Sequence, residues 1–186
     1  MTEVSRLPLV AEGDLDESLV PLLERFQKAG LDVPVLYRTL ANAPKMLQGW
    51  IGFAWSLRND AQTDRGLREL AIMRVAQLTG ASYEWQAHWP MAEHFGMSRD
   101  QLAELKEWSS SDSFSDEQRL ILALTDDLTL RLDISDETWT ALMVAYTPAD
   151  LVELVLTVAF YSCVSRVLGA FQLRPDGDSE GIADLM

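Results

Sequence analysis

The sequence predicts an all-α fold of about eight helices in one domain. Apolar residues recur at spacings of three and four, the period of a helix with one buried face, and the alternation typical of strands is scarce. Glycine, proline and N-capping residues separate these periodic segments. Hydrophobic residues make up 48% and charged residues 24% of the 186 residues, as in an ordinary soluble globular domain.

The first half of the chain is predicted to hold four helices after an extended N-terminal arm. Leu19, Leu22 and Phe26 share one helical stripe, which Gly30 ends. Proline begins the next two segments, where its missing N–H costs nothing. Asp64 is placed to cap the fourth helix. The expected helices cover 15–29, 34–40, 44–57 and 66–78, with a polar loop from Arg58 to Thr63 before the last of them.

Serine residues divide the second half of the chain into the remaining helices. Ser82 is a candidate N-cap because its hydroxyl can accept from a free backbone N–H. Ser98 opens a capping-box pattern, Ser115 or Asp116 is placed to cap the next segment, and Ser135 the one after that. The expected helices cover 82–95, 98–108, 115–130, 136–146 and 148–169.

The predicted organisation is one helical domain between two short ends. The expected ranges are an N-terminal arm over 1–14, the helical domain over 15–173 and an acidic tail over 174–186. The N-terminus has no basic segment followed by an apolar one, so we expect no secretory signal and a cytoplasmic location. The most apolar stretch, Leu151 to Val164, is too short to span a bilayer and carries Glu153, which indicates a buried core helix.

The formal net charge of −14 narrows the classes of partner. A surface this acidic repels phosphate backbones and anionic lipids, so we expect neither nucleic acid nor a membrane as a partner. It also gives no long-range attraction for a strongly anionic substrate, although a local cluster of arginines overrides this where one exists.

Cys163 is the only cysteine in the chain. A single thiol forms neither an intramolecular disulfide nor a paired-thiol redox site, and one sulfur with two histidines is a thin supply of metal ligands. We therefore expect no metal and no cofactor, and we expect Cys163 to be a small buried apolar residue.

Glu84 and His88 are the residues best placed for acid–base chemistry near neutral pH. They are four apart, so on one helix they share a face and can touch. Tyr83, Trp85 and Trp89 surround them in sequence with aromatic surface, and a dry setting shifts pKa values toward those needed for proton transfer. The alternative is a solvated Glu–His pair on a helix surface, which has no function.

The segment from Arg65 to His88, RGLRELAIMRVAQLTGASYEWQAH, resembles the signature of the carboxymuconolactone decarboxylase family. The likeness covers about residues 15–173 and implies an AhpD-like helical bundle. It also implies that Glu69, Glu84 and His88 converge on one site. Their positions on either side of the Thr-Gly turn leave a depth mismatch of roughly 6 Å, which crossed helices, long side chains or a water must bridge.

The resemblance excludes one branch of that family. Its peroxidases carry a CxxC motif with a histidine four residues after the second cysteine, and here Ala81 and Glu84 stand at the two cysteine positions. Without a thiolate nucleophile and a resolving partner, thiol-based peroxide reduction has no route.

The resemblance implies a cofactor-free lyase or isomerase acting on a small lactone or oxygenated acid. In this interpretation His88 is the acid/base and Glu84 its partner or a second acid, while Glu69 orients the imidazole. The remaining roles are assigned to substrate contacts: Arg74 would hold a substrate carboxylate, and Tyr83, Trp85 and Trp89 would form the dry wall.

The alternative is a non-catalytic helical oligomer that binds a small molecule or serves as an accessory protein. Six tryptophans and several helices that are apolar all round exceed what such a domain buries alone, so self-association is expected under either interpretation. The resemblance implies a homo-oligomer, and dimer, trimer and hexamer all remain open.

Overall fold

The computed structural model describes residues 5–30, 32–175 and 182–186, and within these residues the chain is all-helical with nine α-helices and no strand. The predicted fold class is therefore confirmed. Parts of the predicted arm (1–4) and of the acidic tail (176–181) lie outside the described residues. The α-helices are α1 Val20–Ala29, α2 Val35–Leu40, α3 Pro44–Trp55, α4 Arg65–Thr79, α5 Ser82–His94, α6 Arg99–Ala103, α7 Asp116–Arg131, α8 Asp136–Ala145 and α9 Pro148–Phe171.

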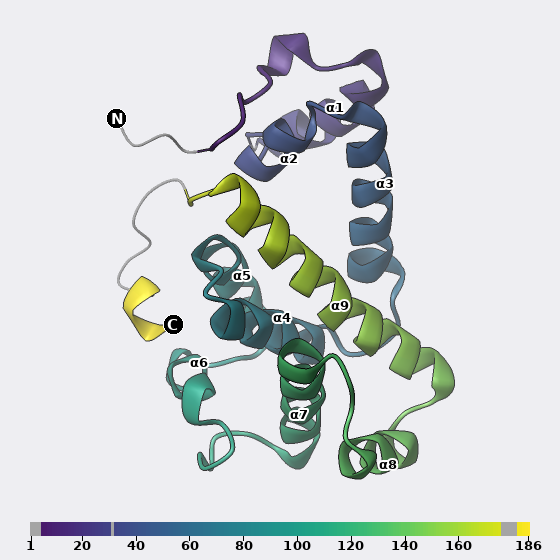
Figure 1. Ribbon diagram of the computed structural model, residues 1–186, viewed down its shortest axis with the longest axis vertical. Coiled ribbons are helices and arrows are strands. Elements are labelled where there is room, and N and C mark those ends of the chain that lie inside the picture. Colours follow the sequence, from purple (N-terminus) through teal and green to yellow (C-terminus); the bar gives the residue numbers. More distant parts are fainter. Residues whose placement is uncertain (1–4, 31, 176–181) are drawn as a thin grey trace.

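Helix α4 lies at the centre of the fold and packs against α5, α7 and α9 (Figure 1). Every residue from Gly66 to Ala76 is buried, so the helix has no solvent-facing side over that length. Its mixture of small, apolar and charged residues allows this only because each charged side chain finds a partner inside the protein. Gly66 is where the backbone comes closest to another segment: a Cβ there would lie 2.7 Å from the carbonyl oxygen of Phe95.

Helix α9 crosses the molecule diagonally, between the α1–α3 end and the α6–α8 end (Figure 1). One side of α9 belongs to the main core, through Leu154, Val158, Tyr161 and Val164. By length and composition it is the only helix in the described chain that is long and apolar enough to cross a membrane, and half of its most apolar stretch is buried in the fold. Cys163, expected to be buried, is exposed on this helix.

Most of the predicted helix ends are found where they were expected. Gly30 and Gly80 adopt the left-handed conformation that ends α1 and α4, with φ values of 67° and 66°. Asp64 caps α4, and Ser115 caps α7 in a complete capping box.

Three local predictions were wrong. Ala81, not Ser82, is the N-cap of α5, and no side chain caps that end. Ser98 accepts from the backbone of Gln101, but the Gln101 side chain donates to Ser113 and Gln118 instead of closing the box. The segment predicted as a loop from Arg58 instead continues α3 as a π-helical turn, Ser56–Asp60. Such turns widen the helix and redirect its side chains.

Candidate active site

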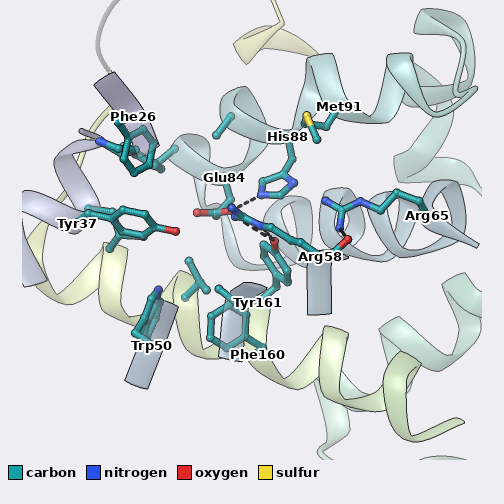
Figure 2. Close-up of a pocket in the computed structure, with 16 residues that line it drawn as sticks. Phe26, Tyr37, Trp50, Arg58, Arg65, Glu84, His88, Met91, Phe160 and Tyr161 are labelled. Atoms are coloured by element: carbon teal, nitrogen blue, oxygen red, sulfur yellow. Dashed lines mark hydrogen bonds and ion pairs between the residues drawn. The ribbon is translucent and has the colours of Figure 1, made fainter. Parts of the chain in front are cut away.

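A pocket of about 280 Å³ lies on the side of α5 that faces α9, close to α2, α3 and the π-helical turn (Figure 2). Aromatic side chains form much of its wall: Phe26, Tyr37, Trp50, Phe160 and Tyr161. The polar groups that reach it are carried by Arg58, Arg65, Glu84 and His88. An apolar enclosure with a few convergent charged groups is typical of a small-molecule site.

His88 lies between two carboxylates. Its Nδ1 is 2.7 Å from Oε2 of Glu69, and its Nε2 is 3.2 Å from Oε2 of Glu84. The three side chains are buried, with His88 and Glu84 each 5% exposed and Glu69 fully buried. The sequence placed Glu84 and His88 one helical turn apart on α5, and the structure brings Glu69, which the family resemblance implied at this site, to them from α4.

The α4–α5 hairpin brings Glu69 to His88 by direct contact. The two helices turn back on each other at Gly80 and pack closely along their length. The expected depth mismatch is spanned by the Glu69 side chain itself, so no bridging water is needed at a distance of 2.7 Å. The other carboxylate oxygen of Glu69 accepts a hydrogen bond from Arg65, one turn earlier on α4.

These contacts stabilise the charged forms of both His88 and Glu69. Burial by itself lowers the pKa of the His88 imidazole, but Tyr161 and the carboxylates of Glu69 and Glu84 outweigh it and raise that pKa well above its usual value. Burial raises the pKa of the Glu69 carboxyl, but its hydrogen bond to His88 and the charges of His88 and Arg65 outweigh burial and lower that pKa. The pair is therefore imidazolium and carboxylate near neutral pH.

Arg58, Tyr161 and Tyr37 are site residues that the sequence did not identify. The Nε and Nη2 atoms of Arg58 each donate to the Tyr161 hydroxyl over 3.4 Å, and Tyr37 extends its hydroxyl toward the same space (Figure 2). Arg58 was expected in a solvated loop, and nothing in the local pattern signals the π-helical turn that directs it inward. Tyr161 is 103 residues away on α9, beyond the reach of any local motif.

Two of the aromatic residues assigned to the pocket wall lie elsewhere. Trp85 and Trp89 are buried in a second core cluster with Leu102 and Leu105, and the Trp85 indole donates to the carbonyl of Ile182. Neither lines the pocket. Each follows a site residue by one position, and neighbours on a helix point about 100° apart, so they face a different side of α5.

Arg74 was expected to hold a substrate carboxylate and does not reach the pocket. Its Nε and Nη2 atoms form a two-pronged ion pair with Asp126, at 2.7 and 2.9 Å, and its Nη1 donates to Gln77 and to the carbonyl of Leu105. These contacts join α4 to α7 and to the segment after α6. Arg74 is a structural residue, whereas Tyr83 does line the pocket as expected.

No cluster of three or more histidine, cysteine, aspartate or glutamate side chains suited to a metal ion is present in the described parts of the chain. Cys163 is not among the residues lining the pocket.

Part of the site lies in a segment that matches a known protein family, whereas Tyr37 and Tyr161 lie outside that segment. The sequence profile of the Carboxymuconolactone decarboxylase family matches residues 44–127, which run from α3 into α7 and include Arg58, Glu69, Glu84 and His88. No curated protein matches the chain by sequence.

Solved structures share the fold across nearly the whole chain. The alkylhydroperoxidase AhpD core of an uncharacterized peroxidase-related protein from Ralstonia eutropha JMP134 has a TM-score of 0.80 at 20% identity, covering 95% of this chain and 94% of that one. An uncharacterized peroxidase-related protein from Silicibacter sp. TM1040 has a TM-score of 0.81 at 18% identity, covering 95% and 94%. The debrominase Bmp8 in complex with 2,3,4-tribromopyrrole has a TM-score of 0.80 at 17% identity, covering 99% and 97%.

Proposed function

The chain belongs to the carboxymuconolactone decarboxylase-like (AhpD-like) family, and from its site we propose that it is a cofactor-free lyase or isomerase that transfers protons on a small lactone or oxygenated acid. One observation carries the proposal: the buried imidazole of His88 touches a carboxylate at each ring nitrogen, and one of those carboxylates, Glu84, lines the pocket. The family's peroxidase chemistry needs a pair of cysteines, and this chain has one cysteine.

The contacts suggest a division of labour within the three residues. Because both nitrogens of His88 are engaged, Glu84 is the group that meets the substrate. His88 passes protons to and from Glu84, and Glu69 fixes the orientation of the imidazole and its charge. Glu84 is then the catalytic residue, and Glu69 and His88 act through it.

In a decarboxylation, the bond between the substrate carboxylate and its carbon breaks, and the electron pair remains on the substrate as an enolate. Carbon dioxide leaves, the imidazolium of His88 passes its proton to the Glu84 carboxylate, and Glu84 delivers that proton to the carbon. Solvent supplies the one proton consumed. In an isomerisation, Glu84 removes a proton from one carbon and returns it to another, with no net consumption.

The pocket's size and walls are consistent with a compact ring as substrate. A volume of about 280 Å³ lined by aromatic side chains suits a molecule of that kind. Bmp8, which shares the fold, is a debrominase whose structure contains 2,3,4-tribromopyrrole. That likeness supports a small cyclic ligand and leaves the reaction type to the residues of this chain.

Deuterium incorporation tests the proposal without knowledge of the natural substrate. Small unsaturated lactone acids are incubated with the protein in deuterium oxide and followed by proton NMR for exchange at carbon and for carbon dioxide release. Glu84→Gln is expected to slow the reaction at least about 100-fold, the usual contribution of a general acid–base group. Glu93→Gln, an exposed change on the same helix, is the matched control and should keep the wild-type rate. Equal rates in Glu84→Gln and wild type would overturn the proposal.

One observation supports self-association, which both the catalytic and the non-catalytic interpretation include. An apolar groove of about 540 Å³ lies between α8 and α9, and its lining residues Trp139, Met143, Val152 and Leu156 are exposed. Exposed apolar surface of this extent indicates a protein interface. We propose that a second copy of the chain covers this groove, which is compatible with either function.

A further inference from the structure

The guanidinium of Arg58 is a charged group in the pocket that forms no salt bridge with a carboxylate of the described residues, although the charge of Glu84 acts on it. It is half-buried on the π-helical turn, and no acidic side chain in the described residues forms a salt bridge with it. Its identified hydrogen bonds go to the hydroxyl of Tyr161, at 3.4 Å from both Nε and Nη2. A phenol supplies a dipole but no compensating charge.

Of the arginines on α4, Arg65 and Arg74 are neutralised inside the protein, whereas Arg68 donates to the carbonyl oxygen of Leu57 and does not line the pocket. Arg65 pairs with Glu69, and Arg74 pairs with Asp126. Withdrawing a charge from water without a counter-ion is costly, and proteins usually meet that cost with a paired group or a ligand. Unlike Arg65 and Arg74, Arg58 forms no salt bridge within the described residues, and its side chain lines the pocket.

The charges around the pocket leave one positive charge in excess. Arg58, Arg65 and the protonated His88 are the cations, and Glu69 and Glu84 are the anions. The burial of Arg58 lowers the pKa of its guanidinium, but Tyr161, Tyr37 and Glu84 outweigh burial and raise that pKa, so the group keeps its charge. A singly charged anion would balance the pocket, whereas a doubly charged one would exceed it.

The aromatic walls of the pocket limit the shape of the ligand that can lie beside Arg58. Phe26, Trp50 and Phe160 present aromatic surface, and Figure 2 shows Tyr37 and Arg58 extending toward the same space. We propose that Arg58 is the anion-binding residue of this pocket and receives the carboxylate of a small, planar, singly charged acid, with the hydroxyls of Tyr37 and Tyr161 beside it. Guanidinium and carboxylate are planar groups that match in a two-pronged contact.

This inference rests on the proposed function only in taking the same pocket as the reaction site. Arg58 moves no proton in it. It orients the acid so that the reacting carbon faces Glu84, and the local charge offsets the repulsion that a chain of net charge −14 exerts on an anion. The arginine expected from the sequence to do this, Arg74, is replaced in that role by Arg58.

Calorimetric titration with benzoate and with benzamide tests the assignment, because the two probes share a shape and differ in charge. Wild type is expected to bind benzoate at least about tenfold more tightly than benzamide, in line with hydrogen bonds to a charged group. Arg58→Gln should weaken benzoate at least about tenfold and leave benzamide unchanged, whereas Arg58→Lys should keep part of the preference. Arg166→Gln removes an exposed arginine of α9 outside the pocket and should behave as wild type.

A second measurement covers the case in which Arg58→Gln does not fold. In wild-type protein labelled with nitrogen-15, the Nε–H signal of Arg58 is expected to shift with benzoate and to remain in place with benzamide. Equal affinity of wild type for the two probes, retained preference in Arg58→Gln, or an unmoved Nε–H signal overturns the assignment.

The binding test also separates this assignment from the proton-transfer proposal. Benzoate affinity retained in Glu84→Gln, together with no exchange by wild type on any lactone acid, removes the proposed reaction and leaves Arg58 as the anion-binding residue. Proton exchange on a lactone acid together with equal affinity for benzoate and benzamide overturns the assignment of Arg58 and leaves the proton-transfer proposal standing.

Discussion

Oε2 of Glu69 lies 2.7 Å from Nδ1 of His88, and Glu69 has no exposed surface. The imidazole is therefore held by a carboxylate that water does not reach, while its Nε2 contacts Glu84 at the pocket. This geometry makes Glu69 a positioning residue: it sets the orientation and charge of His88 without touching a substrate.

Replacing Glu69 by glutamine is expected to lower the pKa of His88, because the amide removes the negative charge at Nδ1. It also leaves Arg65 without its partner, so the free energy of unfolding should fall by about 3 kcal/mol, as for other broken buried pairs. NMR titration of the ring protons follows the first effect and urea unfolding the second. Signals of His94 are identified with a His94→Gln variant, and Glu93→Gln serves as the exposed control. An unchanged His88 titration in Glu69→Gln contradicts the assignment.

The contribution of His88 to the free energy of unfolding should be lost at alkaline pH. The folded pKa is raised above the unfolded value of about 6.5, so the contribution is complete below that pH and is lost as the pH rises through the folded pKa. Glu69 has a lowered pKa, so its contribution is present above its unfolded value and is lost as the pH falls through the folded one. The difference in unfolding free energy between wild type and His88→Gln should shrink from pH 6 toward strongly alkaline pH. A difference that grows over this pH range would contradict a raised pKa of His88 in the folded protein.

Arg74→Gln should reduce stability and leave ligand binding intact. The variant loses the two-pronged pair with Asp126 and the bond to the carbonyl of Leu105, all outside the pocket. A loss of about 2 kcal/mol is expected from hydrogen bonds to charged groups. Thermal or urea unfolding measures this, and benzoate titration should give the wild-type affinity. A tenfold weaker affinity for benzoate in the folded variant would contradict the conclusion that Arg74 lies outside the binding site.

Gly66→Ala is expected to destabilise the protein by about 2 kcal/mol, the usual cost of overpacking. A Cβ at this position would lie 2.7 Å from the backbone carbonyl of Phe95, which cannot rotate away. Gly49→Ala is the matched control: it lies in α3 with nothing within 4 Å of the new Cβ, and it should stabilise the helix by about 0.5–1 kcal/mol. Urea unfolding of both variants checks the contrast, and a stable Gly66→Ala protein would contradict the close approach.

Val152→Asp should reduce self-association. Val152 is 57% exposed in the groove between α8 and α9, so a charge there costs little in the single chain and much in an apolar interface. Light scattering after size-exclusion chromatography measures the mass in solution. Val144→Asp, at an exposed residue of α8 that does not line the groove, is the control. A wild-type chain that remains monomeric at high concentration rules out a second copy as the occupant.

Helix formation and the Glu84–His88 contact follow from local physics, which is why they could be predicted from the residues. Spacing of apolar residues, Gly80 at a left-handed position and caps such as Ser115 depend on neighbours within a turn or two. Ser82 failed as a cap because α5 begins one residue earlier than the side-chain pattern indicates.

The remaining features depend on how the helices pack. Which side of α5 faces α9 decides that Glu84 lines a pocket while Trp85, the next residue, enters a separate core. The π-helical turn directs Arg58 into the pocket, where the hydroxyl of Tyr161 on α9 accepts a hydrogen bond from it. A local pattern specifies the direction of a side chain relative to its own helix, whereas the partner that it meets depends on the crossing of helices far apart in the chain.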